Sequence, residues 1–189
     1  MTSLRLGPAP PTPAALYRYA CRTAPHSREI NHNFADCPLD ADTARVIRIT
    51  GSLGNGKQCY RRAKKMLLEW RMHEGSDTTG VMHTANGAVV TWSRMLPGLL
   101  VFNPCRELAP MVGRRHATVA YATTRGHLLA GTERMSVRWD LNGEVCFELL
   151  SVSRGAGVGR FLFPFLAPAQ HRFFKEQLRC MQLLSQRGL

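Results

Sequence analysis

The sequence contains no long apolar run. Its longest candidates, "PGLLVF" and "RFLFPFLA", are far shorter than the roughly 18 residues that a membrane-spanning helix needs. None of its six cysteines forms a C-x-x-C pair, and nothing ahead of them reads as a signal peptide. These absences argue against a membrane span, a structural zinc site and a secreted disulfide framework. We expect reduced thiols, no metal and no cofactor, and an intracellular location that is cytoplasmic or organellar (mitochondrion or plastid).

Acidic residues are also scarce. The 13 Asp and Glu stand against 25 Lys and Arg, which gives a net charge of +12 over 189 residues. Such a charge suits an anionic partner, whether nucleic acid, an acidic protein or a membrane surface. The excess falls mainly on residues 51–100 and 151–189. Because 44% of the residues are hydrophobic, a chain of this length predicts one domain over residues 1–189 with a single core.

The N-terminal segment has two interpretations. Its first 28 residues contain arginine but no acid, a composition typical of an organellar transit peptide. Alternatively, residues 1–11 are a flexible proline-rich lead to a folded core over residues 12–186, which begins with a helix in "TPAALYRYACRTA". Thr12 would then cap that helix, and Pro13 suits its first turn. Composition leaves both interpretations open.

From residue 44 onward the patterns predict an α+β domain. "ARVIRIT" reads as a strand, a helical period follows, and six short candidate strands come after residue 79. Asn86-Gly87 and Asn142-Gly143 are the strongest hairpin signals. The chain then returns to a helical period from about Ala167 to Gln186. We therefore expect an antiparallel sheet of about six or seven strands, with this long helix across its concave face.

The first of these two helices is amphipathic. Its apolar residues recur at a spacing of 3.6 residues, and its basic residues lie on the opposite face. That face is either a solvated surface or a contact for RNA or another anion. The stripe consists of Tyr60, Ala63, Leu67 and Trp70. The candidate anion contacts on the two helices are Lys57, Arg61, Lys64, Lys65, Arg172, Lys175 and Arg179.

The segment that opens this helix has the spacing of a nucleotide-binding P-loop. Gly51-Ser-Leu-Gly54-Asn-Gly56-Lys57 fits G-x-x-x-x-G-K, but Gln58 stands where a P-loop has the Ser or Thr that coordinates magnesium. Antiparallel hairpins follow, whereas a P-loop belongs to a parallel sheet. We therefore do not expect nucleotide binding. Gly54 and Gly56 instead allow a tight turn from strand into helix.

A series of short motifs resembles uncharacterised protein family 0548, the DUF1990 domain, over roughly residues 4 to 185. Each motif is modest, and their order makes the match specific. The matching residues are Gly54, Gly56, Trp70-Arg71-Met72, Asn103-Pro104-Cys105-Arg106, Tyr121, Thr123, Gly126-His127, Gly131, Glu133, Ser151, Ser153-Arg154 and Phe173. The resemblance implies a START-like or Bet v 1-like helix-grip fold and favours a structural first helix over a transit peptide.

A helix-grip fold implies a cavity between sheet and helix. Its lining would come from strand residues that otherwise form plain core, namely Val90, Trp92, Val101, Tyr121, Trp139, Phe147 and Leu149. Charged residues in apolar motifs should pair. They form either a structural network, such as Glu133 or Glu148 with Arg154, or a pocket mouth for a carboxylate or phosphate with His127 titrating near neutral pH. The candidate pocket residues are Trp70, Arg71, Arg106, Tyr121, His127, Glu133, Trp139, Glu148 and Arg154.

Three function classes remain open. The first is a binding module for a small amphipathic or anionic ligand. The second is a basic accessory or structural subunit that docks on RNA or on a large, ribosome-like or organellar assembly. The third is an enzyme of unknown reaction. We assign no catalytic residue, because no G-x-S-x-G elbow is present and a meeting of Ser151 or Ser153 with His127 would depend on the tertiary fold.

Overall fold

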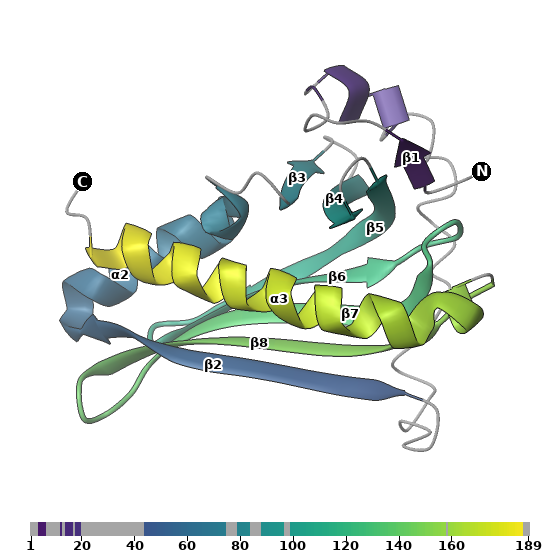
Figure 1. Ribbon diagram of the computed structural model, residues 1–189. Helices are drawn as coiled ribbons and strands as arrows, with labels where there is room; N and C mark the ends of the chain where they lie inside the picture. The colour runs from purple at the N-terminus through teal and green to yellow at the C-terminus, as the bar shows by residue number, and fades with distance from the viewer. Residues whose placement is uncertain are drawn as a thin grey trace.

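An antiparallel sheet forms the body of the protein in the computed structural model (Figure 1). The structure describes residues 4–6, 12, 14–16, 18–19, 44–74, 79–83, 88–96, 99–157 and 159–186. The strands are β1 (Leu4–Leu6), β2 (Arg45–Asn55), β3 (Thr79–His83), β4 (Ala88–Leu96), β5 (Leu99–Val112), β6 (His116–Thr123), β7 (Leu129–Trp139) and β8 (Glu144–Gly155). The helices are α2 (Gly56–Leu68), the 3₁₀ turn η2 (Arg71–His73) and α3 (Gly159–Gln186).

The sheet order is β2-β8-β7-β6-β5-β4-β3, and the short β1 pairs with β5. Consecutive strands from β3 to β8 are neighbours, as in a meander, and β2 joins the last strand of it. Helix α3 lies along the sheet and packs on β2 and β8. The predicted fold class, an antiparallel sheet that grips a long C-terminal helix, is confirmed. Residues 4–6, within the expected lead, add a short strand at β5.

The strand-to-helix turn before α2 forms as the glycines predict. Gly54 and Gly56 have φ angles of +130° and +85°, which other residues rarely adopt. The amide of Gly56, at the start of α2, donates to the carbonyl of Gly143 at 2.8 Å. Every strand pairing in the described part of the chain is antiparallel. The glycine loop therefore lacks the parallel βαβ context of a P-loop.

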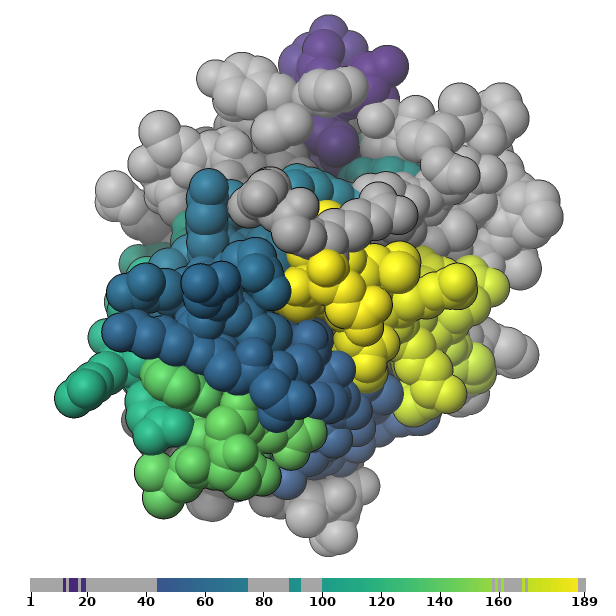
Figure 2. Space-filling model, turned by 90° about the vertical axis from the view of Figure 1, so that its left-hand side faces the viewer, coloured from purple at the N-terminus to yellow at the C-terminus, as the bar shows by residue number. Residues whose placement is uncertain are grey.

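Two apolar clusters lie on opposite faces of the sheet. The larger one joins α2 and α3 to the face that we call the inner face; it includes the predicted stripe of α2 and Phe174 and Met181 of α3. Figure 2 shows α2, in blue, and the C-terminal part of α3, in yellow, side by side. The smaller cluster consists of Leu16, Tyr19, Val90, Trp92, Leu100 and Phe102. Residues 14–16 and 18–19 are helical and thereby cover the other face at β4 and β5.

The predicted cap of that N-terminal helix is confirmed. The amide of Ala15 donates to the side-chain oxygen of Thr12 at 3.2 Å and to its carbonyl at 2.9 Å. Tyr19 lies with its ring centroid 5.1 Å from that of Phe102. The segment is therefore packed on the sheet. The predicted turn at Asn86-Gly87 falls outside the described residues, whereas Gly143 of the second predicted turn has a φ of +93°.

Two boundaries differ from the sequence prediction, both at prolines. β5 was expected to end at Asn103, but it continues through Pro104 and Pro110 to Val112. Pro110 sits at a register shift between Leu108 and Met111, where a missing N–H does not interrupt the ladder. α3 begins at Gly159 rather than near Ala167 and therefore contains Pro164 and Pro168, which remove backbone N–H donors without ending the helix.

Candidate functional site

One row of side chains crosses the inner face through five strands. Strand register places its members directly opposite one another, and strand alternation points them toward α3. From β5 to β2 the row reads Glu107, Tyr121, Glu133, Ser151 and Ile47. The row is polar over four of its five positions, although it lies under a helix where apolar residues are the rule. It is therefore the part of the inner face that plain core packing explains least.

Hydrogen bonds join this row to α3. The Tyr121 hydroxyl donates to the Glu133 carboxylate. The side-chain amide of Gln170 lies 3.1 Å from the Ser151 hydroxyl and 3.5 Å from both Glu133 Oε1 and the Ser153 hydroxyl. We call these five residues the polar cluster. The polar cluster connects β6, β7, β8 and α3. Its hydrogen-bond donors are neutral hydroxyl and amide groups, and it contains one carboxyl group.

The row continues on the other side of Tyr121 to Trp70. The Trp70 indole donates to Glu107 Oε1 at 3.4 Å, and its ring centroid lies 5.6 Å from that of Tyr121. Trp70 has a φ of 56°, in the left-handed region, at the end of α2. This conformation costs a non-glycine residue roughly 1 kcal/mol. The packing of its indole on Tyr121 and its bond to Glu107 offset that cost.

Removal from water changes the acid–base properties of the polar cluster. It raises the pKa of Glu133 to about 7, and the hydrogen bonds from Tyr121 and Gln170 only partly counter this rise. The same burial, with the nearby Glu133 charge, holds the pKa of Tyr121 well above its ordinary value. Around pH 7 the cluster therefore contains a carboxyl group that can exist with or without its proton, beside a protonated phenol.

The polar cluster is not completely enclosed at Glu133. Tyr121, Ser151, Ser153 and Gln170 are all buried, whereas Glu133 is only partly buried. The Oε1 atom of Gln170 is buried and has no hydrogen-bond partner in the described residues. A buried carbonyl without a partner is uncommon and indicates a water molecule or a ligand. The polar cluster is thus both accessible and incompletely satisfied.

A second row of residues lies beside the first on the inner face, two residues further along β5, β6 and β7. Thr123 Oγ1 accepts from the Gly131 amide at 2.8 Å and donates to the Gly131 carbonyl at 3.1 Å. Cys105 lies in register with Thr123 and is buried, and burial raises its pKa well above the ordinary value of a thiol. It is therefore an unreactive thiol. These residues fix the geometry of β6 and β7 at the polar cluster.

The structure brings together three of the nine predicted pocket residues, Trp70, Tyr121 and Glu133. Arg106 and Arg154 are exposed and, by strand alternation, point to the opposite face of the sheet. Glu148 also lies on that face and pairs with Arg48 at 3.6 Å and Arg134 at 3.8 Å. The suggested pairing of Glu133 or Glu148 with Arg154 is therefore wrong.

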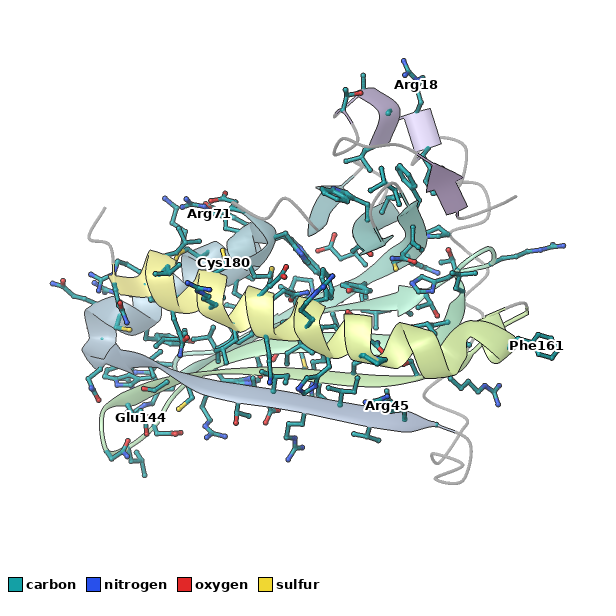
Figure 3. All side chains as sticks on the ribbon, viewed as in Figure 1. Arg18, Arg45, Arg71, Glu144, Phe161 and Cys180 are labelled. Carbon is teal, nitrogen blue, oxygen red and sulfur yellow. The ribbon has the colours of Figure 1, made fainter. Side chains whose placement is uncertain are left out.

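Arg71 and Trp139 make their contacts away from the polar cluster. The Arg71 guanidinium binds Glu74 at 2.8 Å, and Figure 3 shows it beside Cys180 near the C-terminal end of α3. Trp139 lies on the inner face but six residues along β7 from Glu133, where it stacks on Tyr60 at 6.0 Å. Neither residue reaches the polar cluster.

His127 lies at the end of the sheet nearer the polar cluster. We expected its side chain to titrate near neutral pH, and it does not. It lies in the turn between β6 and β7, and its Nδ1 accepts from the Leu129 amide at 2.8 Å. Burial lowers its pKa to about 3. The imidazole is therefore neutral at pH 7 and holds the turn.

The predicted cavity lining is divided between two faces. Tyr121, Phe147 and Leu149 belong to the inner core, as expected. Val90 and Trp92 belong to the smaller cluster under the N-terminal helix, so their assignment to the cavity is wrong. Both faces of β4 and β5 are covered, and sequence alternation alone does not distinguish them. Val101 is buried and lies in register with Leu4 of β1.

A surface depression of about 430 Å³ lies on the opposite face, across β2, β8, β7 and the start of β6. Its charges are already matched: Arg134 lies 3.8 Å from Glu148, and Arg138 lies 2.6 Å from Asp140. The site has no excess charge of either sign to select an ion. It resembles a solvated, self-paired sheet face more than a binding site.

The basic residues of both helices point away from the core. Lys57, Arg61 and Lys65 on α2 are exposed, as are Arg172, Lys175 and Arg179 on α3. Lys64 is partly buried; its Nζ lies 3.3 Å from the Gly113 carbonyl and 5.9 Å from the Tyr60 ring centroid. Arg172 has Glu176 4.0 Å away. A solvated helix surface accounts for these positions.

Sequence reasoning missed Gln170 as a site residue. The available signal was its position in the helical period of α3, since it stands four residues before Phe174 and eleven before Met181 on the apolar stripe. A glutamine in such a stripe needs a polar partner. Ser151 and Ser153 were noted only as possible nucleophiles, and strand alternation places both on the face of Glu133.

Four described cysteines, Cys59, Cys105, Cys146 and Cys180, are free thiols, and burial raises the pKa of each. The described residues contain no cluster of three or more His, Cys, Asp or Glu that could hold a metal ion. None of the helices in the described part of the chain combines the length and the apolar character that crossing a membrane requires.

Comparison with known proteins decides the family. Residues 28–180 match the profile described as a domain of unknown function, DUF1990. The chain belongs to the DUF1990 family. A UPF0548 protein of Arabidopsis thaliana is 29% identical over 157 residues, which cover 78% of this chain and 76% of that protein. A UPF0548 protein of Deinococcus radiodurans is 29% identical over 191 aligned residues, with 91% and 94% covered.

Solved structures support the helix-grip fold of this DUF1990 protein. A hypothetical protein of Helicobacter pylori superposes with a TM-score of 0.52 at 10% identity, covering 83% of this chain and 96% of that one. The di-domain aromatase/cyclase BexL from the BE-7585A biosynthetic pathway superposes with a TM-score of 0.50 at 13% identity, covering 94% and 63%. At such identities the similarity establishes the START-like, Bet v 1-like fold and nothing about chemistry.

Proposed function

We propose that this DUF1990 protein binds a small amphipathic molecule between the inner face of its sheet and α3, at the polar cluster. The observation that carries the proposal is the incompletely satisfied Gln170 amide above Glu133, Ser151 and Ser153. An apolar core does not need such a cluster, whereas a pocket that orients a ligand does.

The surroundings of the cluster suit the apolar part of such a ligand. Trp70 and Tyr121 present aromatic rings on one side, and Phe174 is fully buried on α3 beside Gln170. Aromatic and apolar walls with a few fixed polar groups are the usual composition of small-molecule sites. BexL, of the same fold, is a di-domain aromatase/cyclase, so a helix-grip domain can serve small-molecule chemistry. The proposal for this chain is binding; it includes no reaction step.

Native mass spectrometry of freshly purified protein, followed by titration with the neutral dye Nile red, tests this proposal. We expect a retained small molecule or saturable dye binding by the native protein. Gln170→Leu keeps the size of the side chain but removes its amide, so it should lose both. Arg154→Ala, on the opposite face of the sheet, is the matched control and should behave as the native protein. If the native protein retains nothing and does not bind Nile red saturably, the proposal is wrong.

A further inference from the structure

Two glutamines occupy the most buried line of α3. Gln170 is 9% exposed and Gln177 is 1% exposed, and both face the sheet with Phe174 and Met181. Seven residues of α-helix separate the two amides by about 10 Å along the axis. On a helix that grips a sheet, these positions would normally carry leucine or another apolar residue.

Both glutamines have unsatisfied amide atoms. Gln177 Oε1 and Nε2 are buried and have no hydrogen-bond partner within the described chain, and the same is true of Gln170 Oε1. Leaving such groups unpaired costs free energy, so native proteins nearly always supply a partner. These three orphan atoms, and the buried Ser185 Oγ four residues beyond Met181, lie on one line of α3 and indicate an occupant that the described chain itself does not provide.

The charges around this line do not favour an anion. Glu133 receives its hydrogen bonds from the neutral Tyr121 hydroxyl and Gln170 amide. The arginines that would have held a carboxylate or phosphate lie elsewhere: Arg106 and Arg154 are exposed on the other face, and Arg71 binds Glu74. An anionic ligand at Gln170 would meet the Glu133 carboxylate, and none of these three arginines would compensate its charge.

We propose that the ligand is an uncharged, elongated amphipathic molecule with a hydroxyl or carbonyl group near each end, one bound by Gln170 and the other by Gln177. This inference rests on the proposed function and specifies the ligand class of that site. A primary amide can donate and accept at once, which suits hydroxyl and carbonyl groups equally. Phe174, fully buried between the two glutamines on the same face, would contact the apolar middle of the ligand.

Displacement of Nile red by three probes of equal chain length tests the inference: 1-octanol, 1,8-octanediol and octanoate. We expect the native protein to bind the diol roughly 3- to 10-fold more tightly than the monoalcohol, as one added hydrogen bond provides. Octanoate should bind at least about tenfold more weakly than 1-octanol, because of Glu133. In Gln177→Leu the advantage of the diol should disappear while 1-octanol binds as before. In Glu133→Gln the penalty on octanoate should shrink.

The outcomes separate this inference from the proposed function. Saturable dye binding with equal affinities for the diol and 1-octanol, or with octanoate bound best, would overturn the inference and leave the proposed function standing. If Gln177→Leu makes the free protein more stable and leaves the affinity for the diol unchanged, Gln177 holds only a water molecule, and the inference is again overturned. Failure of Nile red to bind at all would overturn both.

Discussion

A Cβ atom on Gly131 of β7 would lie 2.1 Å from the carbonyl oxygen of Val152 on β8 and 2.7 Å from the Cα of Ser153. Both contacts involve backbone, which cannot move without opening the strand pair. The same glycine exchanges two hydrogen bonds with the Thr123 hydroxyl. Close approach of β7 and β8 at this point is what positions Glu133, two residues along β7, beside Ser151.

Gly131→Ala should therefore lower the free energy of unfolding by about 3 kcal/mol, the upper end for overpacking a well-packed site. Gly113→Ala is the matched control, since its Cβ would meet only the His116 carbonyl, at 3.3 Å, and it should cost much less. Urea unfolding of both variants measures the difference. Equal stability of the two would show that β7 and β8 can separate at Gly131 without loss.

Glu133 should make stability depend on pH. Its pKa is about 7 in the folded protein, against an ordinary value of 4.5. The unfolded chain therefore loses this proton at lower pH than the folded one, so the free energy of unfolding should fall as the pH rises from about 4.5 to about 7. Glu133→Gln cannot titrate and still accepts from Tyr121. It should be more stable than the native protein at pH 8, by at most about 3 kcal/mol, and equal to it at pH 4.

Chemical unfolding at a series of pH values checks this prediction. Glu148→Gln serves as the control, because Glu148 lies on the opposite face and pairs with Arg48 and Arg134. A Glu133→Gln variant whose stability follows the native pH profile would mean that the Glu133 carboxyl remains well hydrated in the folded protein.

His127 should change the free energy of unfolding with pH in the direction opposite to Glu133. Its pKa is about 3 in the folded protein against an ordinary 6.5, so the unfolded chain takes up this proton first as the pH falls. The free energy of unfolding should therefore drop as the pH decreases from about 6.5 toward 3. His127→Asn retains an acceptor for the Leu129 amide but cannot gain the charge, and it should lose less stability in this range.

The windows of His127 and Glu133 overlap between about pH 4.5 and 6.5, where the two effects have opposite signs. The comparison is therefore cleanest in the Glu133→Gln background, with and without His127→Asn, followed by thermal unfolding at pH 4, 5 and 6.5. A double variant as acid-sensitive as the Glu133→Gln single variant would show that His127 is protonated in the folded protein too.

The sequence predicted the fold class because its signals were local. The amphipathic stripe of α2, the glycines before it and the turn at Asn142-Gly143 each depend on residues close together in the chain. Strand boundaries at prolines were less predictable, since whether Pro104 and Pro110 end β5 depends on the strands beside them. An isolated X-Pro signal does not show whether a partner strand needs the missing N–H.

The site was only partly predictable for a related reason. Tyr121 and Glu133 were selected from motifs, but the motif residues Arg106 and Arg154 alternate to the other face. The alternation of side chains along a strand separates the residues of the two faces, but it does not show which face packs against α3. In this protein the N-terminal helix covers the second face at β4 and β5, so apolar composition did not identify the inner face there. The helical period of α3 places Gln170 on the buried stripe, but the strand residues that it meets depend on the register of α3 over the sheet, which no local pattern contains.

The N-terminal helix offers a final prediction that separates the two faces. Tyr19 is 6% exposed and packs on Phe102 in the cluster with Trp92. Tyr19→Ala should lower the free energy of unfolding by about 3 kcal/mol, as expected for a large aromatic side chain removed from a core. Because this cluster lies on the face opposite the polar cluster, the affinity for Nile red should not change.

Arg18→Ala is the adjacent control, since Arg18 is exposed and points away from the sheet (Figure 3). It should change neither stability nor dye affinity. Tryptophan fluorescence adds a local readout, because loss of the Tyr19 ring should let water reach Trp92 and shift its emission to longer wavelength, whereas Trp70 on the inner face should be unaffected. If Tyr19→Ala is as stable as Arg18→Ala, the N-terminal segment contributes nothing to the folded domain.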